Sequence, residues 1–313
     1  MLLVSGKEIK SSISMPEAID YVAKGFSDFN DGLFHMPQRT IMDIEAATVL
    51  TMPCYRKDGK YFVIKVVTVF DQSSIKKDKM VDSFVLVFDS KNGNLLAKLD
   101  GDSITAIRTG AASGIATKYF SSPLSEVLAI FGTGVQALTQ VEAVISCRPI
   151  KKVFVYSRNV KSAKRFSDHI HNLFSIDVMP GKVKDLKNAD VICTATPSED
   201  SLFKLGTIKR GVHINAIGSF KPSMKEIHCD IINSSKIIVD SLGACRKEAG
   251  DLIQAKNETS WDFDNVSMQL GEVFSKQEKL NDLQKNNTLF KSVGLAFQDL
   301  VMAEAIMLSL IHI

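Results

Sequence analysis

One segment constrains the fold more than any other, because an apolar run, a glycine-rich turn and a helical segment follow one another from residue 127. Residues 127–131 (VLAIF) form a continuous apolar run, typical of a strand buried on both faces of a parallel sheet. Residues 132–137 (GTGVQA) fit the pattern GxGxxA. Its first glycine allows a tight turn, its second lets a pyrophosphate approach the backbone, and its alanine lets the helix pack on the strand. We therefore predict a dinucleotide-binding turn.

Strands and helices alternate around this turn. We predict helices over 135–147 and 160–173, and strands over 127–131, 152–157, 190–194, 213–217 and 236–240. Such alternation implies right-handed βαβ crossovers and a doubly wound parallel sheet.

The first 120 residues follow a different pattern. We predict a helix over 15–31, with Ser14 as its N-cap and Pro16 in its first turn. Strand-like runs follow at 47–52, 61–70, 83–89 and 95–99, and a helix is predicted over 104–120. Residues 89–94 (DSKNGN) read as a hairpin turn, so these strands form an antiparallel sheet. The predicted fold class is α/β: a Rossmann doubly wound parallel sheet domain plus a second, α+β domain.

Length and charge agree with two globular domains and exclude several classes. The chain has 313 residues, more than one hydrophobic core usually spans. A formal net charge of +3 over this length is not the footprint of a nucleic-acid-binding protein, so we expect no nucleic-acid partner. The one dense basic run, residues 76–79 (KKDK), is interpreted as a solvated loop.

Cysteine usage predicts a cytoplasmic protein without a metal site. The five cysteines are scattered and none forms a CxxC pair, so they are read as reduced thiols. No cluster of His, Cys and Asp has the spacing of metal ligands. Residues 1–8 lack a basic segment followed by a long apolar one, and no run reaches the roughly 18 apolar residues of a membrane span. We therefore expect neither a signal peptide nor a membrane partner.

The end of the second strand indicates which dinucleotide is preferred. NAD-binding domains usually carry an acidic residue there for the ribose 2′-hydroxyl. This strand ends instead in Ser157, Arg158 and Asn159. A guanidinium can pair with a 2′-phosphate that a carboxylate would repel. We expect NADP(H) to be preferred, and NAD(H) remains open. The alternative is that Arg158 is a solvated surface arginine.

Further segments carry a resemblance to a known family. They are MPQR at 36–39, IKVVTVF at 64–70, VFD at 87–89, DGDSITAIRTGAA at 100–112, GTGVQA at 132–137, ATPS at 195–198, GVHINAIG at 211–218, EAGDL at 248–252 and KSVGLA at 291–296. On these segments the chain resembles the ornithine cyclodeaminase/μ-crystallin family over nearly its whole length.

The resemblance implies a division of labour between two domains. Residues 1–119 with 291–313 would bind substrate and form a homodimer, and residues 120–290 would form the Rossmann domain. It also implies that Arg39, Lys65 and Arg108 line the substrate site and hold a carboxylate. The residues expected at the cofactor are Arg108, Thr109, Gly132, Thr133, Gly134, Val135, Gln136, Ser157, Arg158, Asn159, Thr194, Ala195, Thr196, Ile217 and Gly218.

The three substrate-site cations are also chemically reasonable. Lys65 lies inside an apolar run, where a cation is costly unless it is paired or functional. The alternatives are an edge-strand lysine whose stem reaches water, and a structural ion pair for Arg108. Converging cations favour a small anion, here an α-carboxylate.

One position departs from the family pattern. Cyclodeaminases and the related alanine dehydrogenases resemble this chain around residues 215–218, but they carry an aspartate where Phe220 stands here. A phenyl ring can neither accept a proton nor pair with a substrate ammonium. Similarity to the ketimine and pyrroline-2-carboxylate reductases of the family, which lack the aspartate, therefore implies reduction of a cyclic α-imino acid to L-proline or L-pipecolate.

Several alternatives remain open from the sequence. They are an ornithine cyclodeaminase, an alanine- or opine-type amino-acid dehydrogenase, and an NADPH-dependent small-molecule binding protein of μ-crystallin type. For a reductase, Phe220 would offer an apolar wall to the ring of the substrate. The imine nitrogen would be protonated either by Lys65, whose pKa neighbouring arginines would lower, or directly from water.

Overall fold

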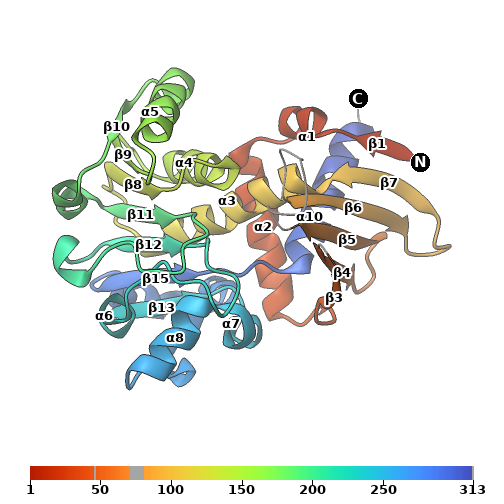
Figure 1. Cartoon of the computed structure of the whole chain (residues 1–313). Coiled ribbons are helices and arrows are strands. Elements are labelled where there is room, and N and C mark those ends of the chain that lie inside the picture. Colours follow the sequence, from red (N-terminus) through yellow and green to blue (C-terminus); the bar gives the residue numbers. More distant parts are fainter. Residues whose placement is uncertain (46, 71–80, 312–313) are drawn as a thin grey trace. The chain divides into compact units, whose positions relative to one another are not determined.

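The structure is a computed structural model that describes residues 1–45, 47–70 and 81–311. The chain divides into two compact units (Figure 1). Unit 1 consists of Met1–Arg108 and the segment from Leu295 onwards, and unit 2 is Thr109–Gly294. The basic run at 76–79 lies outside the described residues.

These boundaries differ from the expected ones after residue 119 and before residue 291. Helix α3 (Gly101–Phe120) crosses the first boundary, because the carbonyl of Thr109 accepts a hydrogen bond from Gln140 and Thr117 Oγ1 accepts one from Asn215. The segment after β15 stays in unit 2, because Asp240 accepts the N–H groups of Val293 and Gly294.

Unit 1 is a mostly antiparallel sheet with helices on one face. Its strands are β1 (Leu2–Val4), β2 (Phe34–His35), β3 (Thr40–Ile44), β4 (Ala47–Arg56), β5 (Tyr61–Phe70), β6 (Val81–Asp89) and β7 (Leu95–Asp100). The strand order is β1-β7-β6-β5-β4-β2, and β3 also pairs with β4. Its helices are α1 (Gly6–Ser12), α2 (Met15–Asn30), the start of α3, and α10 (Ala296–Ile311). The predicted antiparallel sheet is present, whereas β1, β2, β3 and α1 were not anticipated.

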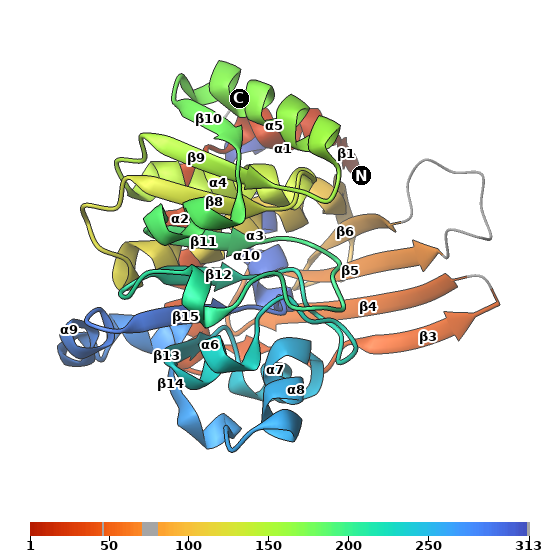
Figure 2. The ribbon, with the colours of Figure 1, turned by 60° about the vertical axis from the view of Figure 1, so that its left-hand side comes forward.

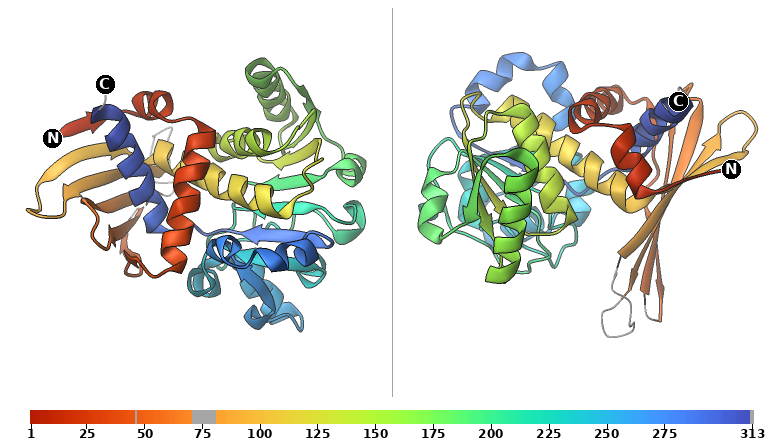
Figure 3. Two further views of the ribbon diagram at one scale, coloured as in Figure 1. Left: turned by 180° about the vertical axis from the view of Figure 1, so that it is seen from behind. Right: turned by 90° about the horizontal axis from the view of Figure 1, so that it is seen from above.

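Helix α10 packs on the sheet of unit 1, and α2 packs against α10 (Figure 3, left). Helix α2 begins where Ser14 and Glu17 form a reciprocal capping box, as expected for an N-cap serine. Gly25 allows the close approach of α10, since a Cβ at this position would lie 2.9 Å from Val301 Cγ2. Helix α10 contacts β4 and β5.

Unit 2 is a parallel sheet with strand order β10-β9-β8-β11-β12-β15-β13-β14 (Figure 2). Its strands are β8 (Val127–Phe131), β9 (Lys152–Tyr156), β10 (Asp177–Pro180), β11 (Val191–Thr194), β12 (His213–Ala216), β13 (Ser235–Val239), β14 (Val266–Gln269) and β15 (Asn287–Lys291). Its remaining helices are α4 (Val135–Cys147), α5 (Val160–Phe174), α6 (Cys229–Asn233), α7 (Leu242–Glu248), α8 (Gly250–Glu258) and α9 (Leu280–Leu283). Short 3₁₀ segments occupy Val183–Asn188, Leu205–Thr207, Phe263–Asn265, Leu270–Phe274 and Gln277–Lys279. The predicted α/β fold class with a doubly wound sheet is confirmed.

The sheet of unit 2 is buried on both faces. Ala129 and Phe131 of β8 belong to one hydrophobic cluster, and Leu128 and Ile130 belong to the other. Alternate side chains of one strand thus fill two cores, which explains why the run is apolar throughout. Within the described residues, no helix has both the length and the hydropathy to cross a bilayer. The five cysteines form no disulfide.

Candidate active site

The glycine-rich turn has the geometry that its sequence predicts. Gly132 has φ +113°, and a Cβ there would lie 2.5 Å from the carbonyl oxygen of Ala195, so no other residue fits. Gly134 caps α4, and a Cβ there would meet nothing within 4 Å. The space beside Gly134 is therefore open to a ligand rather than filled by the chain. Ala137 is fully buried between α4 and the sheet.

A cavity of about 630 Å³ lies at the carboxyl ends of β8, β9 and β11. Eight of the expected cofactor residues line it: Gly132, Thr133, Gly134, Ser157, Arg158, Asn159, Ala195 and Thr196. Six others in unit 2 do not: Thr109, Val135, Gln136, Thr194, Ile217 and Gly218. Among the described residues, none that lines this cavity carries a carboxylate.

The position of this cavity fits a dinucleotide. In doubly wound sheets, dinucleotides bind outside the carboxyl ends of the strands, at the point where the connections reverse direction. Strand β8 lies between β9 and β11, so the glycine turn that follows it stands at that point. The first N–H groups of α4 then face the place of a pyrophosphate.

Unit 1 contains a buried cationic cluster around Lys65. Lys65 is in the middle of β5 and only 2% exposed. Its Nζ donates to Thr105 Oγ1 at 2.5 Å and to Asp299 Oδ1 at 2.9 Å. The Thr105 hydroxyl can accept because its own hydrogen goes to the carbonyl of Gly101, at 2.6 Å. The edge-strand interpretation of Lys65 is therefore wrong, since β5 has β4 and β6 on either side.

Arg108 reaches the same cluster from α3. Its NH1 donates to Gln298 Oε1 at 3.2 Å, and its Nε lies 3.7 Å from Asp299 Oδ1. Asp299 and Gln298 are both fully buried in the first turn of α10. Arg108 thus forms the ion pair that the sequence left as an alternative, in the same cluster as Lys65.

The cluster contains polar atoms that the chain does not satisfy. Among the described residues, Gln298 Nε2 and Asp299 Oδ2 are buried without a hydrogen-bond partner. Lys65 Nζ has two partners, so one of its three N–H bonds has none within the described part of the chain. Buried groups of this kind are rare in native proteins, so they indicate a polar ligand or water.

Charges and burial shift the proton affinity of Lys65. Burial lowers the pKa of Lys65 to about 8, against the attraction of Asp299, and Arg108 and Arg39 lower it further. Of the three cations that the sequence grouped, Lys65 and Arg108 share Asp299 as a partner. Arg39 lies in the loop between β2 and β3, and its charge acts on the pKa of Lys65 in the same direction as that of Arg108.

Sequence reasoning missed Asp299 and Gln298. Asp299 stands inside the largely apolar segment 295–311. A charged residue in such a helix needs a buried partner, and this signal was available. Phe220 follows β12 and is 44% exposed, so it is not packed into the core of unit 2.

Other polar groups have structural explanations. His213 is fully buried in β12, where it contacts Thr288 Oγ1 and Asn215 Oδ1, and burial lowers its pKa to about 3. A neutral, enclosed imidazole is not suited to the role of general acid. His228, Cys229 and Asp230 form a grouping that could hold a metal ion, but His228 Nδ1 already accepts the N–H of Asp230.

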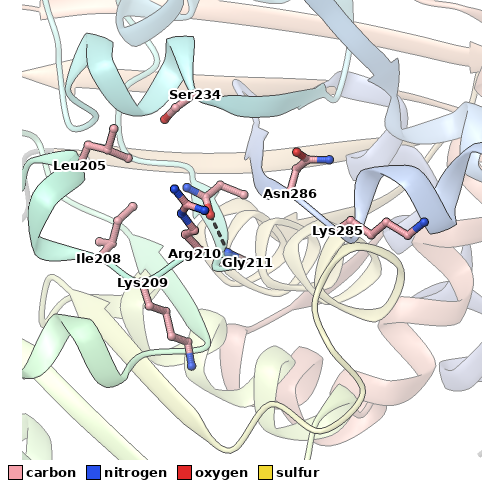
Figure 4. Close-up of a pocket in the computed structure, with 9 residues that line it drawn as sticks. Leu205, Ile208, Lys209, Arg210, Gly211, Ser234, Lys285 and Asn286 are labelled. Atoms are coloured by element: carbon pink, nitrogen blue, oxygen red, sulfur yellow. Dashed lines mark hydrogen bonds between the residues drawn. The ribbon is translucent and has the colours of Figure 1, made fainter.

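A second cavity, of about 480 Å³, lies at the amino ends of β12, β13 and β15 (Figure 4). Its basic residues do not converge, since Lys209 and Lys285 point away from each other. Lys209 is paired with Asp190, and Asn287 Oδ1 accepts the N–H of Gly211 at 2.7 Å. This edge is opposite to the one where dinucleotides bind.

Comparison with known proteins identifies the family. The family model described as ornithine cyclodeaminase/mu-crystallin matches residues 1–311. The chain belongs to this family. Within it, the chain is 34% identical over 309 residues to a Delta(1)-pyrroline-2-carboxylate reductase of Bacillus cereus, covering 97% of this chain and 95% of that protein. It is 31% identical over 300 residues to the ketimine reductase mu-crystallin of Rattus norvegicus, covering 95% and 92%.

Solved structures agree with this assignment. The Delta(1)-pyrroline-2-carboxylate reductase of Thermococcus litoralis, in complex with NADH and L-proline, superposes with a TM-score of 0.93 and 34% identity. The match covers 100% of this chain and 98% of that one. An archaeal alanine dehydrogenase dimer with bound NAD gives a TM-score of 0.92 at 29% identity, covering 100% and 96%. The predicted family is therefore confirmed.

Proposed function

We propose that the chain is an NAD(P)H-dependent reductase of cyclic α-imino acids. The reaction converts Δ1-pyrroline-2-carboxylate to L-proline, or Δ1-piperideine-2-carboxylate to L-pipecolate. The observation that carries the proposal is the buried cluster of Lys65, Gln298 and Asp299, which has both a donor and an acceptor left over. The similarity to pyrroline-2-carboxylate and ketimine reductases supports it.

A cyclic α-imino acid matches both kinds of leftover group. Its carboxylate can accept hydrogen bonds from Arg108 and from Gln298 Nε2, and charge-assisted bonds of this type are strong. Once reduced and protonated, the ring nitrogen of the product carries two N–H bonds, so one can donate to Asp299 Oδ2, which has no partner among the described residues, while the other faces Lys65. A plain carboxylic acid would leave this oxygen unsatisfied.

The chain's own residues prepare the imine for reduction. The bound nicotinamide would supply the hydride, which adds to C2 while the C=N double bond becomes a single bond. The ring nitrogen must carry a proton first, and Lys65 is the proposed donor, through the N–H bond that has no partner. Asp299 holds Lys65 in place and stabilises its protonated form.

A direct assay with candidate substrates tests the function. We expect NADPH oxidation with Δ1-pyrroline-2-carboxylate or Δ1-piperideine-2-carboxylate, and no ammonia release from L-ornithine with NAD⁺. Phe220 cannot pair with an ammonium, and an unpaired buried ammonium is unfavourable by several kcal/mol. Clear turnover of ornithine would contradict the role given to position 220. Turnover of pyruvate with ammonia would favour an alanine dehydrogenase, and binding without turnover would favour a carrier.

Cofactor preference depends on Arg158. We propose that NADP(H) is preferred, because Arg158 lines the cavity and none of the described residues that line it is acidic. Replacing Arg158 with alanine is expected to weaken NADPH binding by roughly 1.5–3 kcal/mol, the range for a hydrogen bond to a charged group, and to leave NADH binding little changed. Fluorescence titration with both cofactors measures this. Arg165→Ala, on the following helix, is the control, and an equal loss for both cofactors would contradict the assignment.

We also propose a homodimer that forms through unit 1. The helices of unit 1 lie on one side of its sheet (Figure 3, right). Along β5 and β6, half-buried apolar residues alternate with the buried ones and so point to the other side: Phe62, Ile64, Val66, Phe84, Leu86 and Phe88. Phe62 and Phe88 stack there with centroids 4.7 Å apart. A continuous apolar face of this kind is typical of a protein interface.

A cytoplasmic location is proposed from the five free thiols, because reduced cysteines are typical of the cytosol.

A further inference from the structure

Glu226 is a buried carboxylate that receives an unusual number of hydrogen bonds. Its side chain is fully buried in unit 2. Oε1 accepts the N–H and the hydroxyl of Thr196, both at 2.7 Å. Oε2 accepts the hydroxyl of Thr194 and the N–H of Gly218, both at 2.8 Å, and the N–H of Ser219 at 3.2 Å. The three backbone N–H groups can only donate, so they require the lone pairs of the carboxylate.

These bonds join two loops that are far apart in the sequence. Thr194 is the last residue of β11 and Thr196 lies in the loop that follows it, whereas Gly218 and Ser219 belong to the loop that follows β12. The loops approach so closely that a Cβ on Gly218 would lie 2.3 Å from the carbonyl oxygen of Thr196. Glu226 therefore fixes both loops at the carboxyl edge of the sheet.

A second buried pair holds Glu226 itself in place. Asp251 Oδ1 accepts the backbone N–H groups of Glu226 and Ile227, at 2.6 and 2.9 Å. Asp251 Oδ2 is bound by Lys291 Nζ at 2.7 Å, and both side chains are fully buried. Burial raises the pKa of Glu226, while Lys291 opposes this shift. Lys291 thus pairs with Asp251 directly, and its positive charge also favours the ionised form of Glu226.

The strand order places these loops relative to a dinucleotide. A dinucleotide that crosses the sheet at β8 has one half over β9 and the other over β11 and β12. The end of β9 carries Arg158, the residue proposed for the 2′-phosphate, so the adenosine half belongs on that side. The nicotinamide half then lies on the side of the loops that Glu226 joins, and Thr196 lines the cavity there.

We propose that Glu226 is a positioning residue, which sets the place of the nicotinamide by holding the loops after β11 and β12 together. This inference rests on the proposed use of NAD(P)H, but not on the identity of the imino acid. It also explains why Thr194 and Gly218 do not line the cavity: they act through Glu226.

The variant Glu226→Gln tests the proposal. If the amide NH₂ replaces Oε1, it faces the N–H of Thr196, and if it replaces Oε2, it faces the N–H groups of Gly218 and Ser219. Either orientation separates the loops. We expect kcat to fall about 10- to 100-fold, the effect of a misplacement near 1 Å. The dissociation constant of NADPH should change less than about threefold, because the adenosine half stays anchored, while the fluorescence emission of bound NADPH shifts toward that of free NADPH.

Two further variants make the outcome decisive. Thr196→Val removes one of the five donors to Glu226. We expect a smaller shift of the NADPH emission in the same direction, with an unchanged thermal midpoint. This variant therefore still tests the proposal if Glu226→Gln does not fold. Glu258→Gln, an exposed residue paired with Lys225, is the control and should match the wild type. Wild-type emission in both Glu226→Gln and Thr196→Val would overturn the proposal. If no imino acid is reduced by the wild type, the proposed function fails, but the emission still decides the role of Glu226.

Discussion

Replacing Lys65 with alanine is expected to lower kcat for the cyclic imino acid by about 10²- to 10⁴-fold, the usual contribution of a positioned general acid. The reason is that Lys65 Nζ is a buried donor that binds Thr105 and Asp299 and has no third partner among the described residues. Steady-state kinetics at saturating cofactor measure the effect. Arg108→Ala should instead raise mainly KM, because its carboxylate contact exists in the ground and transition states alike.

The proposed role of Lys65 as proton donor also predicts the direction in which kcat changes with pH. With its pKa lowered to about 8, Lys65 is protonated below pH 8 and neutral above it. A proton donor must carry its proton, so kcat of the wild type should be constant at lower pH and should fall as the pH rises through about 8. The variant should lack this step, because the titrating group is gone.

The exposed Lys60, just before the same strand, provides a matched control, and Lys60→Ala should behave as the wild type does. A thermal midpoint for each protein separates loss of catalysis from loss of folding. If Lys65→Ala retained the wild-type kcat across the whole pH range, the imine would take its proton from water. Lys65 would then serve only to bind the carboxylate.

The fold could be predicted from sequence where periodicity is strong. The run at 127–131, the glycine turn and the long helices gave the Rossmann architecture, because apolar strands and small residues leave few other solutions. The position of β15 between β12 and β13 could not be predicted from the sequence, because residues 287–291 pair with strands that are more than 45 residues away along the chain. Short strands such as β1 and β10 carry too few residues for a pattern.

The site could be predicted less completely, for a physical reason. Lys65 and Arg108 stand out because they interrupt apolar or small-residue segments. Asp299 acts through Lys65, and Glu226 acts partly through Thr194 and Thr196; these partners lie 30 or more residues away in the sequence. Only the folded chain shows which carboxylate meets which donor. The cofactor list therefore contained residues, such as Gly218, whose bonds go to Glu226 rather than to the cavity.

Replacing Asp299 with alanine is expected to lower the free energy of unfolding by about 3–5 kcal/mol, the cost of removing one partner of a buried ion pair. Asp299 is fully buried, and its Oδ1 lies 2.9 Å from Lys65 Nζ and 3.7 Å from Arg108 Nε. The change leaves two buried cations without this counter-charge. Denaturant unfolding measures the loss, and Asp20→Asn on the exposed face of α2 is the control.

The variant Asp299→Asn separates the charge of this residue from its shape. Because the negative charge of Asp299 raises the pKa of Lys65, its removal should lower that pKa below 8, and kcat should begin to fall at a lower pH than in the wild type. A double-mutant cycle then tests the pair directly. Lys65→Ala and Asp299→Ala together should cost less than the sum of the single changes, by about 0.5–3 kcal/mol, because the double variant buries neither charge of the pair. Strict additivity, with an unshifted pH profile in Asp299→Asn, would show that Asp299 does not control the proton of Lys65.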